Sequence, residues 1–131
     1  MSDEEEEEEP LECRVVVLGE NGVGKTSIIN RYVNNYFGDT MTTSGATFNS
    51  KTVFFEDFNK KINFEIWDTG EHYDRYKLHY PFYKDASACI FVYDICSKYT
   101  FDQLKNYGIN TVKDIANSNL CNLIFNNNFF L

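Results

Sequence analysis

The chain has 131 residues, of which 43% are hydrophobic and 17% aromatic, so it carries enough apolar material for one domain with its own core. The formal net charge is −8, but seven of these charges are the consecutive acids Asp3–Glu9, which leaves −1 for the rest of the chain. A body so nearly neutral, without a basic patch, argues against nucleic acid as a partner.

The acidic run is the first segment of the chain. Its like charges repel one another and offer no apolar surface to bury, so residues 1–11 are expected to form an acidic, disordered tail. The domain itself is then expected to span residues 12–131. We interpret the tail as a solubilising extension, with docking to a basic partner as the alternative.

A glycine-rich loop lies between the first expected strand and the first expected helix. Residues 19–26 read Gly-Glu-Asn-Gly-Val-Gly-Lys-Thr, a full match to the pattern G-x-x-x-x-G-K-[ST]. The β-branched stretch 13–18 before it predicts a buried strand, and apolar residues recur at helical spacing over 28–33 after it. This order of elements is the setting in which the motif binds phosphate, which argues against a plain glycine-rich turn.

Each residue type in this loop suits a nucleoside triphosphate. Gly19, Gly22 and Gly24 let the backbone curl so that successive N–H groups point at phosphate oxygens, beside the positive end of the new helix. We expect Lys25 to reach the β- and γ-phosphates and the Thr26 hydroxyl to bind Mg²⁺.

The rest of the chain alternates between strand and helix patterns. Residues 48–58 and 62–67 alternate apolar with polar side chains around a turn at 56–60, which predicts a hairpin. The apolar run 86–93 predicts a strand that is buried on both faces. A weaker helical pattern, interrupted at Gly108, and an apolar run over 120–125 follow. We therefore expect an α/β fold of the three-layer P-loop NTPase type, ending after about the fifth strand. Its sheet is mostly parallel, with one antiparallel edge strand.

Two polar residues outside the loop are candidates for the same site. Asp68 ends the third expected strand, where a carboxylate facing a phosphate loop can contribute to Mg²⁺ binding. Its alternative is a turn cap, because Asp-Thr-Gly favours turns. Thr43 lies between the first helix and the second strand, and its hydroxyl could close over the metal and the γ-phosphate.

Cysteine usage and the chain ends bear on the compartment. The cysteines are scattered, without a C-x-x-C pair or clustered histidines, which favours a reducing compartment and no structural zinc. No secretory signal, membrane-spanning run or terminal lipidation cysteine can be read, so no membrane anchor is expected. We expect a cytoplasmic protein whose membrane association, if any, is through partners.

Four segments of the chain resemble the Ras-like small GTPase superfamily in order and spacing over about residues 13–120. The second and the fourth are most similar to the Rab branch. The segments are Gly-Glu-Asn-Gly-Val-Gly-Lys-Thr-Ser at 19–27, Thr-Ser-Gly-Ala-Thr-Phe at 43–48, Trp-Asp-Thr-Gly-Glu at 67–71 and Phe-Val-Tyr-Asp-Ile at 91–95.

The resemblance implies a role for each segment. Thr43 belongs to the first switch and Asp68 opens the second, and γ-phosphate contacts order both switches so that only the GTP form engages effectors. It also implies GTP/GDP and Mg²⁺ as cofactors, and effector, exchange-factor and GTPase-activating proteins as partners. The phosphates would lie on the backbone of the loop residues Gly19, Glu20, Asn21, Gly22, Val23, Gly24, Lys25, Thr26 and Ser27.

The second switch departs from the family pattern Asp-Thr-Ala-Gly-Gln-Glu. Gap-free spacing puts Gly70 at the alanine, Glu71 at the glycine that meets the γ-phosphate, and His72 at the glutamine that orients the attacking water. A one-residue shift would instead keep Gly70 as the glycine and put Glu71 at the water. Both registers stay open, with His72 or Glu71 as the catalytic residue, and both predict slow intrinsic hydrolysis.

The base-recognition motif departs more strongly. The family has Asn-Lys-x-Asp after its fifth strand, whereas here Asn127 takes the asparagine position, Asn128 the lysine and Phe130 the aspartate. An unpaired base edge costs about 1–3 kcal/mol, so affinity and guanine preference should fall. We interpret the chain as a C-terminally incomplete G domain. It is either a Rab-like switch that hydrolyses GTP in vesicle trafficking or signalling, or a non-catalytic interaction module that binds nucleotide weakly.

Overall fold

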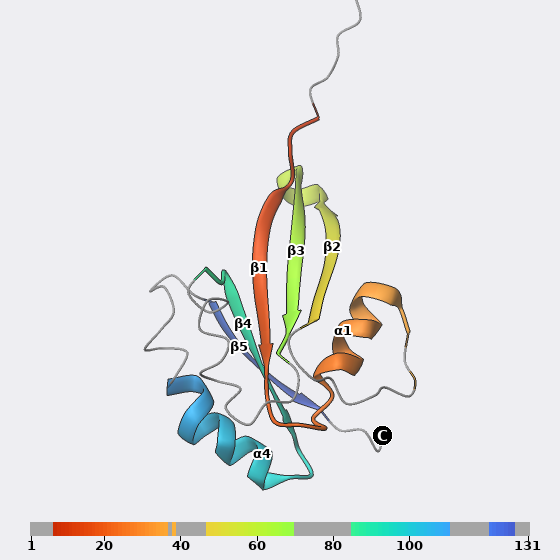
Figure 1. Cartoon of the computed structure of the whole chain (residues 1–131). Helices are drawn as coiled ribbons and strands as arrows, with labels where there is room; N and C mark the ends of the chain where they lie inside the picture. The colour runs from red at the N-terminus through yellow and green to blue at the C-terminus, as the bar shows by residue number, and fades with distance from the viewer. Residues whose placement is uncertain (1–6, 37, 39–46, 70–84, 111–120, 128–131) are drawn as a thin grey trace, which may run out of the picture.

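A five-stranded sheet with the order β2-β3-β1-β4-β5 is the centre of the computed structural model (Figure 1). The structure describes residues 7–36, 38, 47–69, 85–110 and 121–127. Neighbouring strands are parallel except for β2 and β3. The prediction of a mostly parallel sheet with an antiparallel edge strand is therefore confirmed. The elements are β1 (Leu11–Leu18), α1 (Lys25–Asn34), β2 (Thr47–Phe55), η1 (Glu56–Phe58), β3 (Lys60–Asp68), β4 (Ala88–Asp94), α4 (Lys98–Gln103), η2 (Leu104–Gly108) and β5 (Cys121–Asn127).

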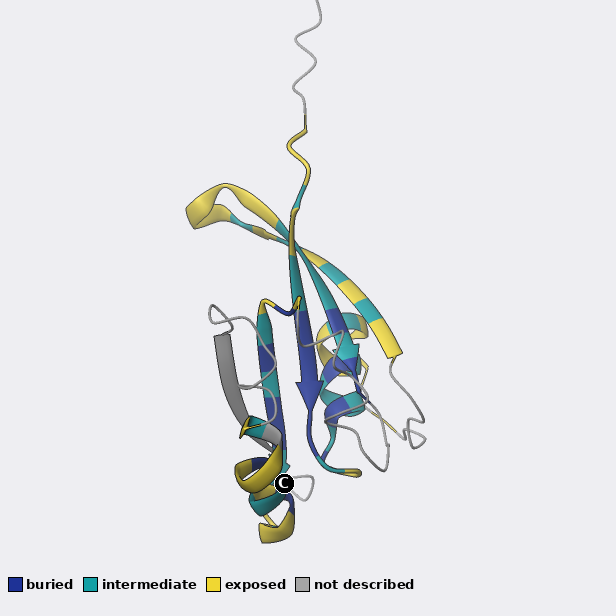
Figure 2. Cartoon of the chain, turned by 60° about the vertical axis from the view of Figure 1, so that its left-hand side comes forward, coloured by how far each residue is buried: buried dark blue, intermediate teal, exposed yellow. Residues whose placement is uncertain are grey.

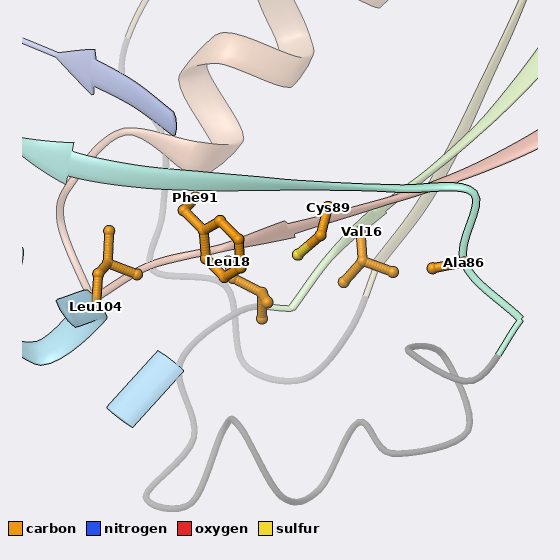
Figure 3. Close-up of a cluster of buried hydrophobic side chains, with 6 residues drawn as sticks. All are labelled: Val16, Leu18, Ala86, Cys89, Phe91 and Leu104. Carbon is orange, nitrogen blue, oxygen red and sulfur yellow. The ribbon is translucent and has the colours of Figure 1, made fainter. Parts of the chain in front are cut away.

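The second half of the central strand β1, residues 15–18, is buried on both faces, which explains its uninterrupted apolar sequence. Val15 and Val17 face one side of the sheet, where they pack with Ile29 of α1. Val16 and Leu18 face the other side and pack with residues of β4 and η2 (Figure 3). Successive side chains of a strand point to opposite faces, so one run of four apolar residues serves both halves of the core. The sheet is thus the middle of the three layers that the sequence predicted.

The two helical layers differ in regularity. Helix α1 is a continuous α-helix of 10 residues, whereas α4 has 6 residues and runs into the 5-residue π-turn η2. The sequence predicts an interruption at Gly108, but the helical conformation continues through Gly108 to residue 110, and the change from α- to π-helix begins at Leu104. Glycine is a poor helix former, and Leu104 at the start of the same turn is only 2% exposed. The turn therefore keeps a large side chain in the core where the sequence weakens the helix.

The hairpin of β2 and β3 extends away from the helices at the far end of the sheet. Its reversal is completed by Asn59, which adopts the left-handed conformation with φ 49°. Asparagine tolerates this conformation better than most residues. Figure 2 shows the hairpin tip as exposed, in contrast to the buried lower half of β1. This predicted hairpin is confirmed.

The N-terminal segment meets the hairpin tip. Strand β1 begins at Leu11, one residue before the expected boundary between tail and domain, because Leu11 already pairs with Ile62 of β3. Just before the strand, Glu8 forms an ion pair of 2.7 Å with Lys60. The described part of the acidic segment is therefore exposed and contacts the hairpin through this ion pair.

Candidate functional site

The glycine-rich loop follows β1 and leads into α1, as the sequence predicts. Gly22 and Gly24 have positive φ values of 76° and 99°, which only glycine adopts without strain. Gly24 is the N-cap of α1, and its carbonyl accepts the first helical hydrogen bond from Ile28 N at 3.0 Å. Val23 is fully buried and packs in the core cluster on the α1 side. One buried side chain thus anchors a loop whose tip, at Asn21 and Gly22, is exposed.

Gly19 is needed for a different reason. It is where the chain leaves β1, directly against the neighbouring strand β4. A Cβ at this position would lie 2.3 Å from the Val92 carbonyl oxygen and 3.0 Å from Cγ2 of Val23. Only a residue without a side chain therefore fits between the loop and β4.

Lys25, the first residue of α1, turns back into the loop. Its Nζ donates to the carbonyl oxygens of Gly19 at 2.8 Å and Glu20 at 2.9 Å, and the residue is only 6% exposed. An ammonium group is strongly hydrated, so burying it is favourable only where acceptors replace the water. Its charge lies at the N-terminus of α1, where the helix dipole is also positive. The two positive contributions add at the mouth of the loop.

Thr26 and Asp68 meet although 42 positions separate them in sequence. The Thr26 hydroxyl donates a short hydrogen bond to Asp68 Oδ2. The parallel pairing of β1 and β3 places Asp68 opposite Val17, one residue before the end of β1. Asp68 is 1% exposed, and Thr69 after it donates through N and Oγ1 to the Val17 carbonyl oxygen at 3.4 and 3.0 Å. The strand register therefore brings a carboxylate from β3 to the hydroxyl that follows the loop.

Oxygen donors of this kind suit Mg²⁺, which prefers carboxylates, hydroxyls and phosphate oxygens. Within the described ranges, no group of three or more His, Cys, Asp or Glu side chains could hold a metal by itself. Thr26 and Asp68 therefore offer two of the oxygen ligands that such a cation could use.

Asn127, which the sequence predicts to contact the base, lies apart from these residues. It is the last residue of β5 and pairs with Asp94, the last residue of β4. Because strands are spaced about 4.8 Å apart, the end of β5 lies roughly 10 Å from the end of β1, on the side away from Asp68. The carboxyl ends of three parallel strands thus lie in a row, with the loop at one end and Asn127 at the other.

The remaining predicted site residues lie outside the described part of the chain. They are Thr43 of the first switch segment and Gly70, Glu71 and His72 of the second. Their assignments therefore stay predictions. Thr100 is not among the residues predicted from the sequence. Its hydroxyl nevertheless forms hydrogen bonds with the backbone of the turn after β4. The sequence signal nearest to it is Ser97, a residue type favoured at a helix N-cap, three positions before Thr100.

Comparison with known proteins agrees with this arrangement. A family model described as Ras of Complex, Roc, domain of DAPkinase matches residues 14–128. The chain belongs to the Ras-like small GTPases. It is most similar to their Rab branch, as the sequence predicted.

Three relatives illustrate the similarity. The Ras-related protein Rab7 of Cenchrus ciliaris is 42% identical over 95 residues, which are 72% of this chain and 45% of that protein. The Ypt/Rab-type GTPase ypt7 of Schizosaccharomyces pombe is 40% identical over the same shares. The putative ras-related protein Rab-5B of Dictyostelium discoideum is 41% identical over 108 residues, 82% of this chain and 49% of that protein.

These matches cover only part of each relative. This Rab-like chain spans about half the length of the curated relatives it matches. Among its described residues, none of the helices has both the length and the apolar character required to cross a bilayer.

Proposed function

We propose that this Rab-like chain binds guanine nucleotide together with Mg²⁺ and hydrolyses GTP slowly, as a switch in vesicle trafficking. The observation that carries the proposal is the buried Lys25 ammonium on the Gly19 and Glu20 carbonyls at 2.8 and 2.9 Å. Its charge and the positive end of α1 combine where the loop backbone is exposed. A polyphosphate provides the complementary charge, and the loop N–H groups are its natural donors.

Each residue of the loop region has a distinct task under this proposal. Lys25 would pair with the β- and γ-phosphates, while the Thr26 hydroxyl and the Asp68 carboxylate would hold Mg²⁺, with Thr43 as a further ligand from the first switch. When bound, Mg²⁺ neutralises phosphate charge. Asn127 would contact the base. The hydrogen bond from the Thr26 hydroxyl to Asp68 Oδ2 supports this assignment, because it brings two oxygen ligands together.

Hydrolysis would depend on a residue that orients water. His72 holds that role in one register of the second switch and Glu71 in the other, and neither matches the neutral amide of the family's glutamine. Single-turnover GTP hydrolysis by His72→Gln and Glu71→Gln separates the two registers. We expect one of these variants to be faster than the unmodified chain by about tenfold or more. If both hydrolyse GTP at the unmodified rate, neither residue orients the water.

Nucleotide binding is tested by calorimetry and by thermal unfolding. A ligand at 1,000 times its Kd stabilises the fold by about 4 kcal/mol, so GTP with Mg²⁺ should raise the unfolding midpoint and ATP with Mg²⁺ should raise it less. Lys25→Ala should remove both the heat of binding and the shift. Lys61→Ala, at the far end of the sheet, is the matched control and should keep them. An absence of heat with both nucleotides would contradict the proposal.

The second candidate function is a GTPase-shaped interaction module. The observation in its favour is the base motif, in which Asn128 and Phe130 replace the family's lysine and aspartate. Such a module would bind effector or regulator proteins of the Rab type without a nucleotide cycle, in the cytoplasm or at membranes through those partners. A partner that binds equally well with GTP, with GDP and without nucleotide would favour this function over the switch.

A further inference from the structure

The turn after β4 is fastened by one buried hydroxyl group. The Thr100 Oγ1 accepts a hydrogen bond from Asp94 N at 3.0 Å and lies 2.7 Å from the Ser97 carbonyl oxygen, to which it donates. Thr100 is 7% exposed. The same turn is closed by Ser97 N on the Asp94 carbonyl at 3.0 Å and by Cys96 N on Asp94 Oδ1 at 2.8 Å. Thr100 is therefore the side chain that ties the start of α4 to the last residue of β4.

That last residue is also in register with β5. The pair Asp94 and Asn127 is the final pair of the β4–β5 ladder. The Asp94 N–H points to the Thr100 hydroxyl, so the strand β4 stops there and the chain turns into α4. The position of the Asn127 backbone consequently depends on a strand end that Thr100 holds in place.

The phosphate loop has separate supports. Gly19 packs on the Val92 carbonyl, two residues before the turn, and Asp68 reaches the loop from β3 on the other side of β1. Within the described residues, the side-chain hydrogen bonds of Thr100 are to Asp94 and Ser97 and not to these elements. A disturbance at Thr100 should therefore spread to the Asn127 end of the site more than to the loop.

We propose that Thr100 is a positioning residue for base recognition: it fixes the Asp94 strand end and, through the Asp94–Asn127 pair, the backbone that presents Asn127 to the nucleobase. This inference rests on the proposed nucleotide site. Its physical basis is that a buried backbone N–H without an acceptor is unfavourable, so the Asp94 turn rearranges when the hydroxyl is lost.

The test compares a ligand that has a base with one that has none. Thr100→Val keeps the side-chain shape and removes the acceptor, whereas Thr100→Ser keeps the hydroxyl. Calorimetry measures the affinity of each chain for GDP and for inorganic tripolyphosphate, both with Mg²⁺. We expect Thr100→Val to weaken GDP binding about tenfold and to leave tripolyphosphate binding within about twofold. Thr100→Ser should restore GDP binding.

Controls separate a positioning role from a general loss of stability. Thr52→Val removes a different hydroxyl, which bonds Asn63 at 3.1 Å on the opposite edge of the sheet, and should alter neither affinity. If Thr100→Val does not fold, Thr100→Cys has a similar size and only a weak acceptor, and it should show the same selective loss.

The outcomes distinguish this inference from the function on which it rests. Equal weakening of GDP and tripolyphosphate by Thr100→Val, or unchanged GDP binding, overturns the positioning role and leaves the nucleotide site intact. If the unmodified chain binds neither ligand, the proposed function fails and this inference fails with it.

Discussion

Two lysines at opposite ends of the sheet show how differently the same side chain is used. Lys25 at the glycine loop is 6% exposed and lies on two carbonyl oxygens. Lys60 at the hairpin tip has a side chain 48% exposed, and its partner Glu8 is 77% exposed. Figure 2 shows the hairpin tip as exposed and the lower half of β1, which leads into the loop, as buried.

The difference shows what each charge costs and contributes. An exposed ion pair adds little to stability, because water solvates both partners almost as well when they are apart. A buried ammonium group loses its hydration, and neutral carbonyls replace only part of it. Lys25 is therefore expected to raise the affinity for nucleotide and to lower the stability of the fold. Lys60 should have little effect on either quantity.

The largest expected effect is at Lys25. Lys25→Met fills nearly the same volume without the charge, so it should lower GTP affinity by about a hundredfold or more. In the absence of nucleotide, its free energy of unfolding should stay equal or rise. Calorimetry and urea unfolding measure the two quantities, with Lys60→Met as the matched variant. A clear loss of stability in Lys25→Met without nucleotide would contradict the comparison.

Two glycines of the loop separate the cost of a steric clash from the cost of an unfavourable backbone conformation. Gly19→Ala brings a Cβ within 2.3 Å of the Val92 carbonyl oxygen, so we expect a loss of about 1–3 kcal/mol. Gly22→Ala meets no atom within 4 Å but must hold φ +76°, which costs about 1 kcal/mol. Urea unfolding of both variants checks which one loses more stability. A greater loss of unfolding free energy for Gly22→Ala would show that the contact between residue 19 and β4 relaxes easily.

The core between the two ends offers a test by pH. Burial raises the pKa of the Cys89 thiol well above its usual range. An unfolded cysteine ionises near pH 8.5, so above that pH the unfolded state loses its proton first and stability falls as pH rises. The unfolding free energy should therefore decline between pH 8 and 10, and less so in Cys89→Ala. Peptide mapping after alkylation of the native chain should find exposed Cys96 modified long before buried Cys89.

The smallest effect is expected at the hairpin. The hydrogen bond and the charge of Lys60 hold the pKa of the Glu8 carboxyl below its usual value. The contribution of Glu8 is present above the pKa of an unfolded glutamate and is lost as pH falls through the lowered value. At neutral pH, Glu8→Gln should leave the thermal midpoint unchanged within error. An NMR titration should show the lowered pKa, and added salt should move it back.

The sequence anticipated the local structure well, because local patterns have local causes. The glycine motif with its flanking strand and helix, the hairpin and the buried apolar run over 86–93 were all predicted, and each depends on neighbours within a few positions. The predicted interruption of the second helix at Gly108 was wrong, because the helical conformation continues to residue 110. The π-helical segment Leu104–Gly108 was not anticipated, since Leu104 is buried in a core that forms only in the tertiary structure.

The amino-acid sequence by itself determined a glycine-rich loop with the phosphate-binding pattern, the family of the chain, and a sheet with apolar residues on both faces. Only the tertiary structure decided which distant residues meet, such as Thr26 with Asp68, Thr100 with the β4–β5 strand end, and Glu8 with Lys60. Such contacts follow from strand order and register, which many weak interactions along the whole sheet fix together. No short stretch of sequence is therefore enough to predict these contacts.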